Sequence, residues 1–250
     1  MKTIAISGKG GTGKSTIAAL MVRLLSRHNA GSVLAVDADS NVNLNVLLGL
    51  EIKDTVGSIR EEMKQSIQNL PGGMSKAQFL EYKIQASLVE TPAYDLIAMG
   101  RPEGPGCYCY ANNLLRDILQ TLSAHYQYII IDNEAGMEHL SRRTTLDIDS
   151  LLIVSDPTVR GVRTASNISR LLNELDTRIG KKKVFVNRLH GEVPPIVTLT
   201  LEEEHLELGL AIREDNNLLE MEQKGESIWT LPDSSPALLA VDKWMENFIH

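Results

Sequence analysis

The hydrophobic residues of this chain gather in short continuous runs, separated by longer stretches with helical spacing. Runs rich in β-branched residues and without a polar alternation are typical of strands that are buried on both faces of a parallel sheet. The clearest runs are Lys2–Ser7, Ser32–Asp37, Tyr128–Asp132, Leu151–Ser155 and Lys183–Asn187. Weaker candidates for strands are Tyr94–Met99 and Leu208–Arg213.

Helical patterns lie between these runs, at Ser15–His28, Asn113–Ala124, Thr164–Leu175 and Pro236–Ile249. The alternation of strand and helix predicts a single α/β domain over residues 1–250, with a doubly wound, mostly parallel sheet and helices on both faces. The polar stretch 50–93 differs, because Glu51–Glu90 is charged and mostly helical in pattern, with a break at Pro71-Gly72-Gly73. We interpret this stretch as a helical insertion between the second and third strands.

Composition excludes several classes of protein. With 43% hydrophobic residues, the 250-residue chain can fill one sizeable core. No apolar run approaches the ~20 residues of a membrane helix, and the first residues reach glycine before a signal peptide could form. Lys and Arg number 25 against 32 Asp and Glu, a net charge of −7 that argues against nucleic acid as a partner. We expect a cytoplasmic protein with no nucleic-acid or membrane partner.

A glycine-rich loop follows the first predicted strand and precedes the first predicted helix. Its sequence G-K-G-G-T-G-K-S fits the pattern G-x-x-x-x-G-K-[ST] of a phosphate-binding loop. Backbone N–H groups and the positive end of the helix dipole can surround a phosphate there. Lys14 then reaches the β- and γ-phosphates, and the Ser15 hydroxyl can bind Mg²⁺. The predicted nucleotide contacts are Gly8, Gly10, Gly11, Thr12, Gly13, Lys14, Ser15 and Thr16.

Carboxylates end two of the predicted strands. Asp37 and Asp39 follow the second strand, where a carboxylate can orient a water for in-line attack or hold a Mg²⁺-bound water. Such residues can also merely cap the next helix. Asp132 ends the apolar run Ile129-Ile130-Ile131, as in a Walker B element, and should contact Mg²⁺ through a water. We expect the segment 133–140 after it to form a switch that senses the γ-phosphate.

The residues at the end of the fifth predicted strand indicate which nucleotide base the protein binds. GTPases of this class carry N-K-x-D there, with an aspartate that pairs with guanine. This chain reads Val186-Asn187-Arg188-Leu189-His190, without an aspartate at the fourth position. ATP is therefore favoured, and Asn187 is the expected contact to adenine.

The additional lysine Lys9 gives the loop a distinctive form, K-G-G-x-G-K-[ST]. This resembles the deviant phosphate loop of the nitrogenase-iron-protein and MinD/ParA family of ATPases. The resemblance implies a homodimer in which Lys9 reaches the partner's ATP, with Asp39 as the hydrolytic carboxylate and Asp37 as its support. A solvated lysine is the alternative. Family members often place I-P-x-D near the base, where this chain has Ile212-Arg213-Glu214-Asp215, so Arg213 is a further candidate contact.

The two cysteines, Cys107 and Cys109, are two residues apart. In an extended segment both sulfurs point the same way, and a closed thiolate site needs four ligands. A twofold dimer would supply four thiolates at its axis, which is the same dimer that Lys9 suggests. A redox disulfide and inert thiols are the alternatives.

Two segments narrow the resemblance further. Gly104-Pro105-Gly106-Cys107-Tyr108-Cys109, and Asp132-x-Glu-Ala-Gly-x-Glu-His-Leu with Arg142 after it, resemble the CooC-type ATPases, which mature carbon monoxide dehydrogenase by nickel insertion. This implies an ATP-driven metallochaperone with Mg²⁺ at the nucleotide, Ni²⁺ or Zn²⁺ at Cys107 and Cys109, and apo carbon monoxide dehydrogenase or a related nickel enzyme as partner. Three alternatives remain: an ATPase serving acetyl-CoA synthase, an iron–sulfur electron-transfer ATPase, and a MinD/ParA-like positioning ATPase.

Overall fold

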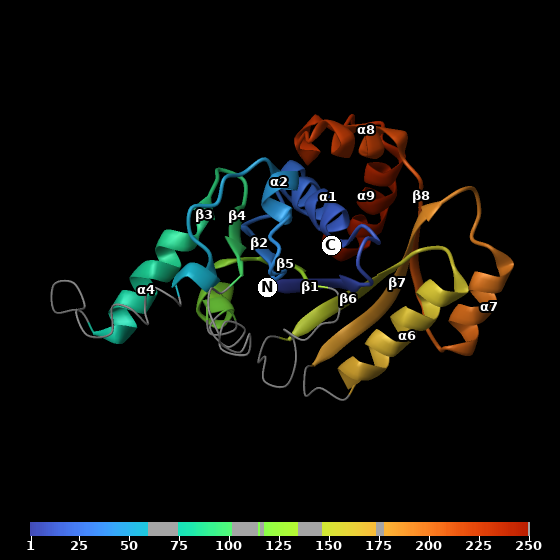
Figure 1. Cartoon of the computed structure of the whole chain (residues 1–250), viewed down its shortest axis with the longest axis horizontal. Helices are drawn as coiled ribbons and strands as arrows, with labels where there is room; N and C mark the ends of the chain where they lie inside the picture. The colour runs from blue at the N-terminus through green and yellow to red at the C-terminus, as the bar shows by residue number, and fades with distance from the viewer. Residues whose placement is uncertain (60–74, 102–114, 116–117, 135–146, 174–177, 250) are drawn as a thin grey trace.

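The computed structural model describes residues 1–59, 75–101, 115, 118–134, 147–173 and 178–249 (Figure 1). In this part of the chain, one eight-stranded sheet has the order β3-β4-β2-β5-β1-β6-β7-β8. The strands are β1 (Lys2–Gly8), β2 (Val33–Asp37), β3 (Val89–Glu90), β4 (Asp95–Ala98), β5 (Tyr128–Asp132), β6 (Ile148–Ser155), β7 (Ile179–Leu189) and β8 (Leu208–Arg213). All neighbours pair in parallel except β3, which pairs antiparallel with β4.

Helices cover both faces of the sheet. They are α1 (Lys14–Arg27), α2 (Leu44–Leu48), α4 (Lys76–Ser87), α6 (Val159–Asn173), α7 (Pro195–Glu203), α8 (Asn216–Lys224) and α9 (Pro236–Ile249), with 3₁₀ turns η2 (Ser123–His125) and η4 (Ile228–Thr230). Figure 1 shows α1, α2, α8 and α9 on one face, and α6 and α7 on the other. No helix in the described ranges is both long and apolar enough to cross a membrane.

The alternation of side chains along each central strand builds two cores. Ile4 and Ile6 of β1 belong to the core under α1 and α9, whereas Ala5 between them belongs to the core under α6 and α7. Successive residues of a strand point to opposite faces, so a strand that is apolar at every position fills both layers. The doubly wound α/β fold predicted from the sequence is therefore confirmed.

Several element boundaries differ from the expectation. The helix α6 begins five residues before the predicted Thr164, and the polar stretch 50–93 contains the edge strand β3 as well as α4. The pattern missed α7 altogether, because its Ile-Val-Thr-Leu-Thr-Leu sequence is rich in residues that favour strands. Pro195 in the first turn and the burial of Val197 and Leu201 decide for a helix.

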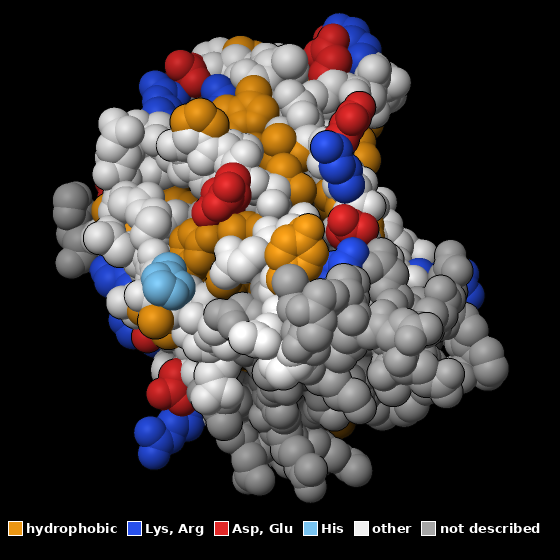
Figure 2. Space-filling view, turned by 90° about the vertical axis from the view of Figure 1, so that its left-hand side faces the viewer, with side chains coloured by type: hydrophobic (Ala, Val, Ile, Leu, Met, Phe, Trp, Pro, Cys, Tyr) orange, Lys and Arg blue, Asp and Glu red, His pale blue; other side chains and the backbone are white. Residues whose placement is uncertain are grey.

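The molecular surface at the β3 edge carries charges of both signs. In Figure 2, which looks at this face, the Lys and Arg side chains of the described residues lie among Asp, Glu and hydrophobic side chains, and they do not merge into one basic field.

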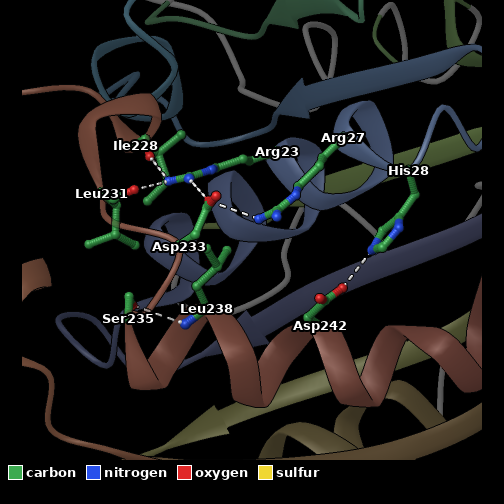
Figure 3. A network of polar contacts seen from close by, with 9 residues as sticks. All are labelled: Arg23, Arg27, His28, Ile228, Leu231, Asp233, Ser235, Leu238 and Asp242. Atoms are coloured by element: carbon green, nitrogen blue, oxygen red, sulfur yellow. Dashed lines mark hydrogen bonds and ion pairs between the residues drawn. The ribbon is translucent and has the colours of Figure 1, made fainter.

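A buried arginine fastens the C-terminal segment to the first helix. Arg23 of α1 donates through Nη1 to the carbonyl oxygens of Ile228 and Leu231, each at 2.7 Å, and through Nη2 to Asp233 at 2.8 Å (Figure 3). Just after the end of α1, Nε2 of His28 lies 2.6 Å from Oδ1 of Asp242 in α9. The contacts of Arg23 hold the segment between α8 and α9 against the helix that follows the phosphate loop, and the contact of His28 holds α9 there.

We predict that Arg23→Ala lowers the free energy of unfolding by about 2–4 kcal/mol, because it leaves two carbonyl groups without their buried donor. Arg27→Ala is the matched control. Arg27 binds the same Asp233 oxygen, but its side chain is 50% exposed against 9% for Arg23, so its loss should cost less than about 1 kcal/mol. Urea denaturation of both variants tests this. Equal losses would contradict the structural role of Arg23.

Candidate functional site: the nucleotide cavity

The loop between β1 and α1 depends on glycines with left-handed backbone conformations. Gly8, Gly11 and Gly13 have φ of 145°, 77° and 94°. A Cβ atom at Gly8 would lie 2.2 Å from the carbonyl oxygen of Val154 on β6. At Gly13 it would lie 2.5 Å from Nδ2 of Asn187 on β7. The backbone of the loop can therefore adopt this conformation only with glycine at these positions.

The two lysines of the loop differ in their surroundings. Lys14, at the first position of α1, is buried, and its Nζ lies 3.4 Å from the carbonyl oxygen of Lys9. The same carbonyl accepts a hydrogen bond from the Thr12 hydroxyl at 2.8 Å. Lys9 itself is exposed to solvent. One ammonium group thus lies inside the loop, and the other is accessible from outside it.

A cavity of ≈ 420 Å³ lies against this loop. Its lining consists of Gly10, Gly11, Gly13, Lys14, Ser15, Thr16, Asp39, Asn41, Asn43, Glu134 and Arg188. The fold thus brings most of the predicted phosphate-loop residues together with Asp39, which comes from the end of β2. Glu134, from the segment after β5, lines the same cavity.

The two aspartates after β2 have different roles in the structure. Asp37 is buried, and its carboxylate accepts hydrogen bonds from the N–H groups of Asp39 at 3.1 Å, Asn43 at 2.8 Å and Leu44 at 2.9 Å. Burial raises the pKa of Asp37 although these N–H groups counteract it. Asp37 therefore shapes the loop and caps α2, whereas Asp39 lines the cavity. A Mg²⁺ contact of Asp37 stays a prediction.

Asp132, at the end of β5, is a buried carboxylate whose two oxygens accept no hydrogen bond of ordinary geometry from the residues that the structure describes. Burial raises its pKa to about 7, and the nearby Ser15 hydroxyl and Lys14 ammonium oppose this. Buried polar atoms without partners are rare in proteins and call for a compensating group. A divalent cation is such a group, so the pair of Asp132 and Ser15 fits the predicted Mg²⁺.

A second cavity, of ≈ 240 Å³, continues from the first. Its lining consists of Gly13, Thr16, Asn187, Arg188, Arg213, Glu214, Asp215, Leu218, Leu219 and Glu222. Gly13, Thr16 and Arg188 line both cavities, so the two cavities adjoin at these residues. Asn187 and Arg213, predicted as base contacts, both lie in the second part.

Sequence reasoning missed the contribution of α8 to this site. Leu218, Leu219 and Glu222 line the second cavity, and Glu222 accepts a hydrogen bond from the Thr16 hydroxyl at 2.9 Å. The available signal was Asp215, which caps α8 by accepting from the N–H of Asn217 at 2.9 Å. An aspartate is one of the residues preferred at the N-cap of a helix, and here the apolar pair Leu218-Leu219 follows within the first turn.

Other predicted site residues lie outside the described residues. These are Cys107 and Cys109, with the segment from Gly136 to Arg142. Among the residues that are described, no group of three or more His, Cys, Asp or Glu side chains is placed to hold a metal ion.

Comparison with known proteins identifies the family. The model of the AAA domain family matches residues 1–185. The chain belongs to this family. An uncharacterized ATP-binding protein of Methanocaldococcus jannaschii is 41% identical over 99% of this chain and 98% of its own length. The carbon monoxide dehydrogenase accessory protein CooC of Rhodospirillum rubrum is 31% identical over 69% of each chain.

The fold of this AAA-domain protein is also that of solved relatives. The crystal structure of a ParA family ATPase from Chlorobium tepidum superposes with a TM-score of 0.74 at 21% identity, and the match covers 97% of this chain and 98% of that one. The family match and the ATP-binding relative make the chain a P-loop ATPase that binds ATP, and its fold is the one seen in solved MinD and ParA proteins.

We predict that Gly8→Ala destabilises the nucleotide-free ATPase more than Gly11→Ala does. Both glycines have positive φ, so each substitution strains the backbone by about 1–2 kcal/mol. Only at Gly8 does the new Cβ collide with a backbone carbonyl; at Gly11 nothing lies within 4 Å. Thermal unfolding of both variants measures the difference. A Gly11→Ala variant as unstable as Gly8→Ala would contradict the close approach to β6.

Proposed function

We propose that this ATPase is a metallochaperone that uses ATP to deliver Ni²⁺ to carbon monoxide dehydrogenase or a related nickel enzyme. The observation that carries the proposal is the C-x-C pair, Cys107 and Cys109, in a MinD/ParA-type chain that is 31% identical to CooC. Two thiolates per chain are half of a tetrahedral site, so a homodimer completes the ligand set. The metal is the cargo of the cycle.

The nucleotide site supplies the driving reaction in this proposal. The N–H groups of the phosphate loop and Lys14 bind the β- and γ-phosphates, and Asp39 orients the attacking water in the cavity. Ser15 and Asp132 would hold Mg²⁺, which neutralises charge on the phosphates when bound. Lys9, exposed at the edge of the loop, is free to reach the nucleotide of a second subunit. Hydrolysis then resets the dimer.

We expect Asp39→Asn to lower ATP turnover by a factor of about 100 or more, because an amide cannot accept the proton of the attacking water. ATP affinity and thermal stability should remain near those of the wild type, since among the described residues the Asp39 carboxylate accepts one hydrogen bond, from the N–H of Asn41 at 2.8 Å. Asp37→Asn is the control, because it weakens three hydrogen bonds of the loop and should lower stability. Phosphate release and differential scanning fluorimetry separate the two effects. Unchanged turnover of Asp39→Asn would remove Asp39 from the mechanism.

The cargo is tested by metal binding. We expect the wild type to bind about one Ni²⁺ per two chains, and the double variant with Cys107→Ser and Cys109→Ser to bind none, because serine hydroxyls do not replace thiolates. ATP turnover should persist in the double variant. The measurement is equilibrium dialysis with Ni²⁺ followed by elemental analysis, with and without ATP, together with the mass in solution.

One control variant and one stated outcome make the result of the dialysis decisive. Lys14→Ala removes a lysine that lines the phosphate cavity and keeps both cysteines, so the influence of nucleotide on metal binding should disappear. A double serine variant with the metal stoichiometry of the wild type would refute the metallochaperone. It would leave the ATPase reaction untouched.

A further inference from the structure

One basic side chain lies where the two cavities of the ATP site meet. Arg188 lines both, together with the neutral residues Gly13 and Thr16. Each of the other basic residues lines one cavity: Lys14 lines the phosphate cavity, and Arg213 lines the second cavity, where the base is expected. A nucleotide that extends from the phosphate loop to Asn187 must therefore pass beside Arg188.

The backbone of Arg188 has an unusual conformation for its position. Its φ is 59°, in the left-handed region, although it belongs to β7. The other non-glycine residues with positive φ in the described chain are Asn29 and His205, which follow the C-terminal ends of α1 and α7. A left-handed residue is ordinary just after a helix, whereas inside a strand it needs a separate cause.

The cause is an irregularity of the sheet at this point. The pairing of β7 with β8 shifts its register between Val186 and Leu189, which brackets Asn187 and Arg188. Asn187 accepts a hydrogen bond from the N–H of Arg188 at 2.9 Å, and its Nδ2 donates to the carbonyl oxygen of Thr12 at 2.9 Å. Bulges of this kind redirect side chains and are frequent next to active sites. Here the bulge is also tied to the phosphate loop.

We propose that this bulge directs Arg188 onto the α-phosphate of the bound nucleotide. The β- and γ-phosphates are assigned to Lys14 and the glycines, and the base to the far cavity, so the group at the junction is the α-phosphate with the adjoining ribose carbon. A guanidinium group offers paired N–H donors that match two oxygens of one phosphate. Arg188 is thus a substrate-binding residue that joins the two parts of the site.

The balance of charged side chains around the site makes the positive charge of Arg188 important for nucleotide binding. Asp39 and Glu134 line the phosphate cavity with Lys14 and Arg188, so acidic and basic side chains are balanced before the anionic nucleotide enters. The second cavity adds three acidic side chains, Glu214, Asp215 and Glu222, and one further basic side chain, Arg213. Removal of Arg188 leaves Lys14 as the one basic side chain among the described residues of the phosphate cavity lining.

The test compares nucleotide affinities of the full-length protein. We expect Arg188→Ala to weaken ATP, ADP and AMP by a common factor of about 10, because all three carry the α-phosphate. Arg188→Lys should lose less, since it keeps the charge without the paired donors. Lys181→Ala removes an exposed lysine near the other end of β7, serves as the charge-matched control and should bind all three like the wild type. Displacement of a fluorescent ADP analogue gives the dissociation constants.

Arg188→Gly separates the guanidinium group from the backbone strain. Glycine adopts the left-handed conformation without penalty, so this variant should unfold at the same temperature as the wild type or higher, and yet bind nucleotides as weakly as Arg188→Ala. Wild-type affinity in Arg188→Gly would overturn the proposal, because the residue would then serve the bulge alone. A loss confined to ATP would equally overturn it, since the contact would be to the γ-phosphate.

Discussion

The site of this ATPase depends on the parallel pairing of β1 with β5, and of β5 with β2. The register aligns Ile6 with Asp132, and Asp132 with Asp37, so that the carboxyl ends of three strands meet at one edge of the sheet. The phosphate loop leaves β1 at this same edge. Because the backbone hydrogen bonds of a buried parallel sheet fix the register, a shift of one strand would separate the loop from the carboxylates that accompany it.

This edge concentrates buried charge at a cost in free energy. Three backbone N–H groups donate to the buried Asp37 carboxylate and stabilise its charge, and these hydrogen bonds fix the conformation of the loop. Asp132 accepts no such bonds from the described part of the chain, and its raised pKa reflects a carboxylate kept away from water. Asp37 and Asp132, which lie side by side on paired strands, thus differ in role. Asp37 is structural, whereas Asp132 is able to bind an incoming cation.

The ends of β7 and β8 supply the other half of the nucleotide site, and individual side-chain hydrogen bonds link them to the first half. Asn187 links β7 to the phosphate loop at Thr12, and Glu222 of α8 accepts from Thr16 of α1. Asp215 adds a link to α9, because it accepts from the Ser235 hydroxyl at 2.5 Å and from the N–H of Ala237 at 3.0 Å. Through these side chains the C-terminal third of the chain helps to shape a site whose best-known motif lies within the first fifteen residues.

The sequence by itself determined the parallel strands of the sheet but not the antiparallel edge strand β3. It also determined the phosphate loop and the carboxylates at the strand ends, because continuous apolar runs and a glycine-rich loop are local features that one stretch of chain specifies. It did not determine α7, whose β-branched residues form a helix only through packing, nor the role of Asp37, whose three donors come from residues up to seven positions away. The contribution of α8 to the nucleotide site and the bulge at Arg188 likewise depend on the tertiary structure. They arise where β7, β8 and the phosphate loop meet, and a contact between residues some 175 positions apart leaves no local pattern in the sequence.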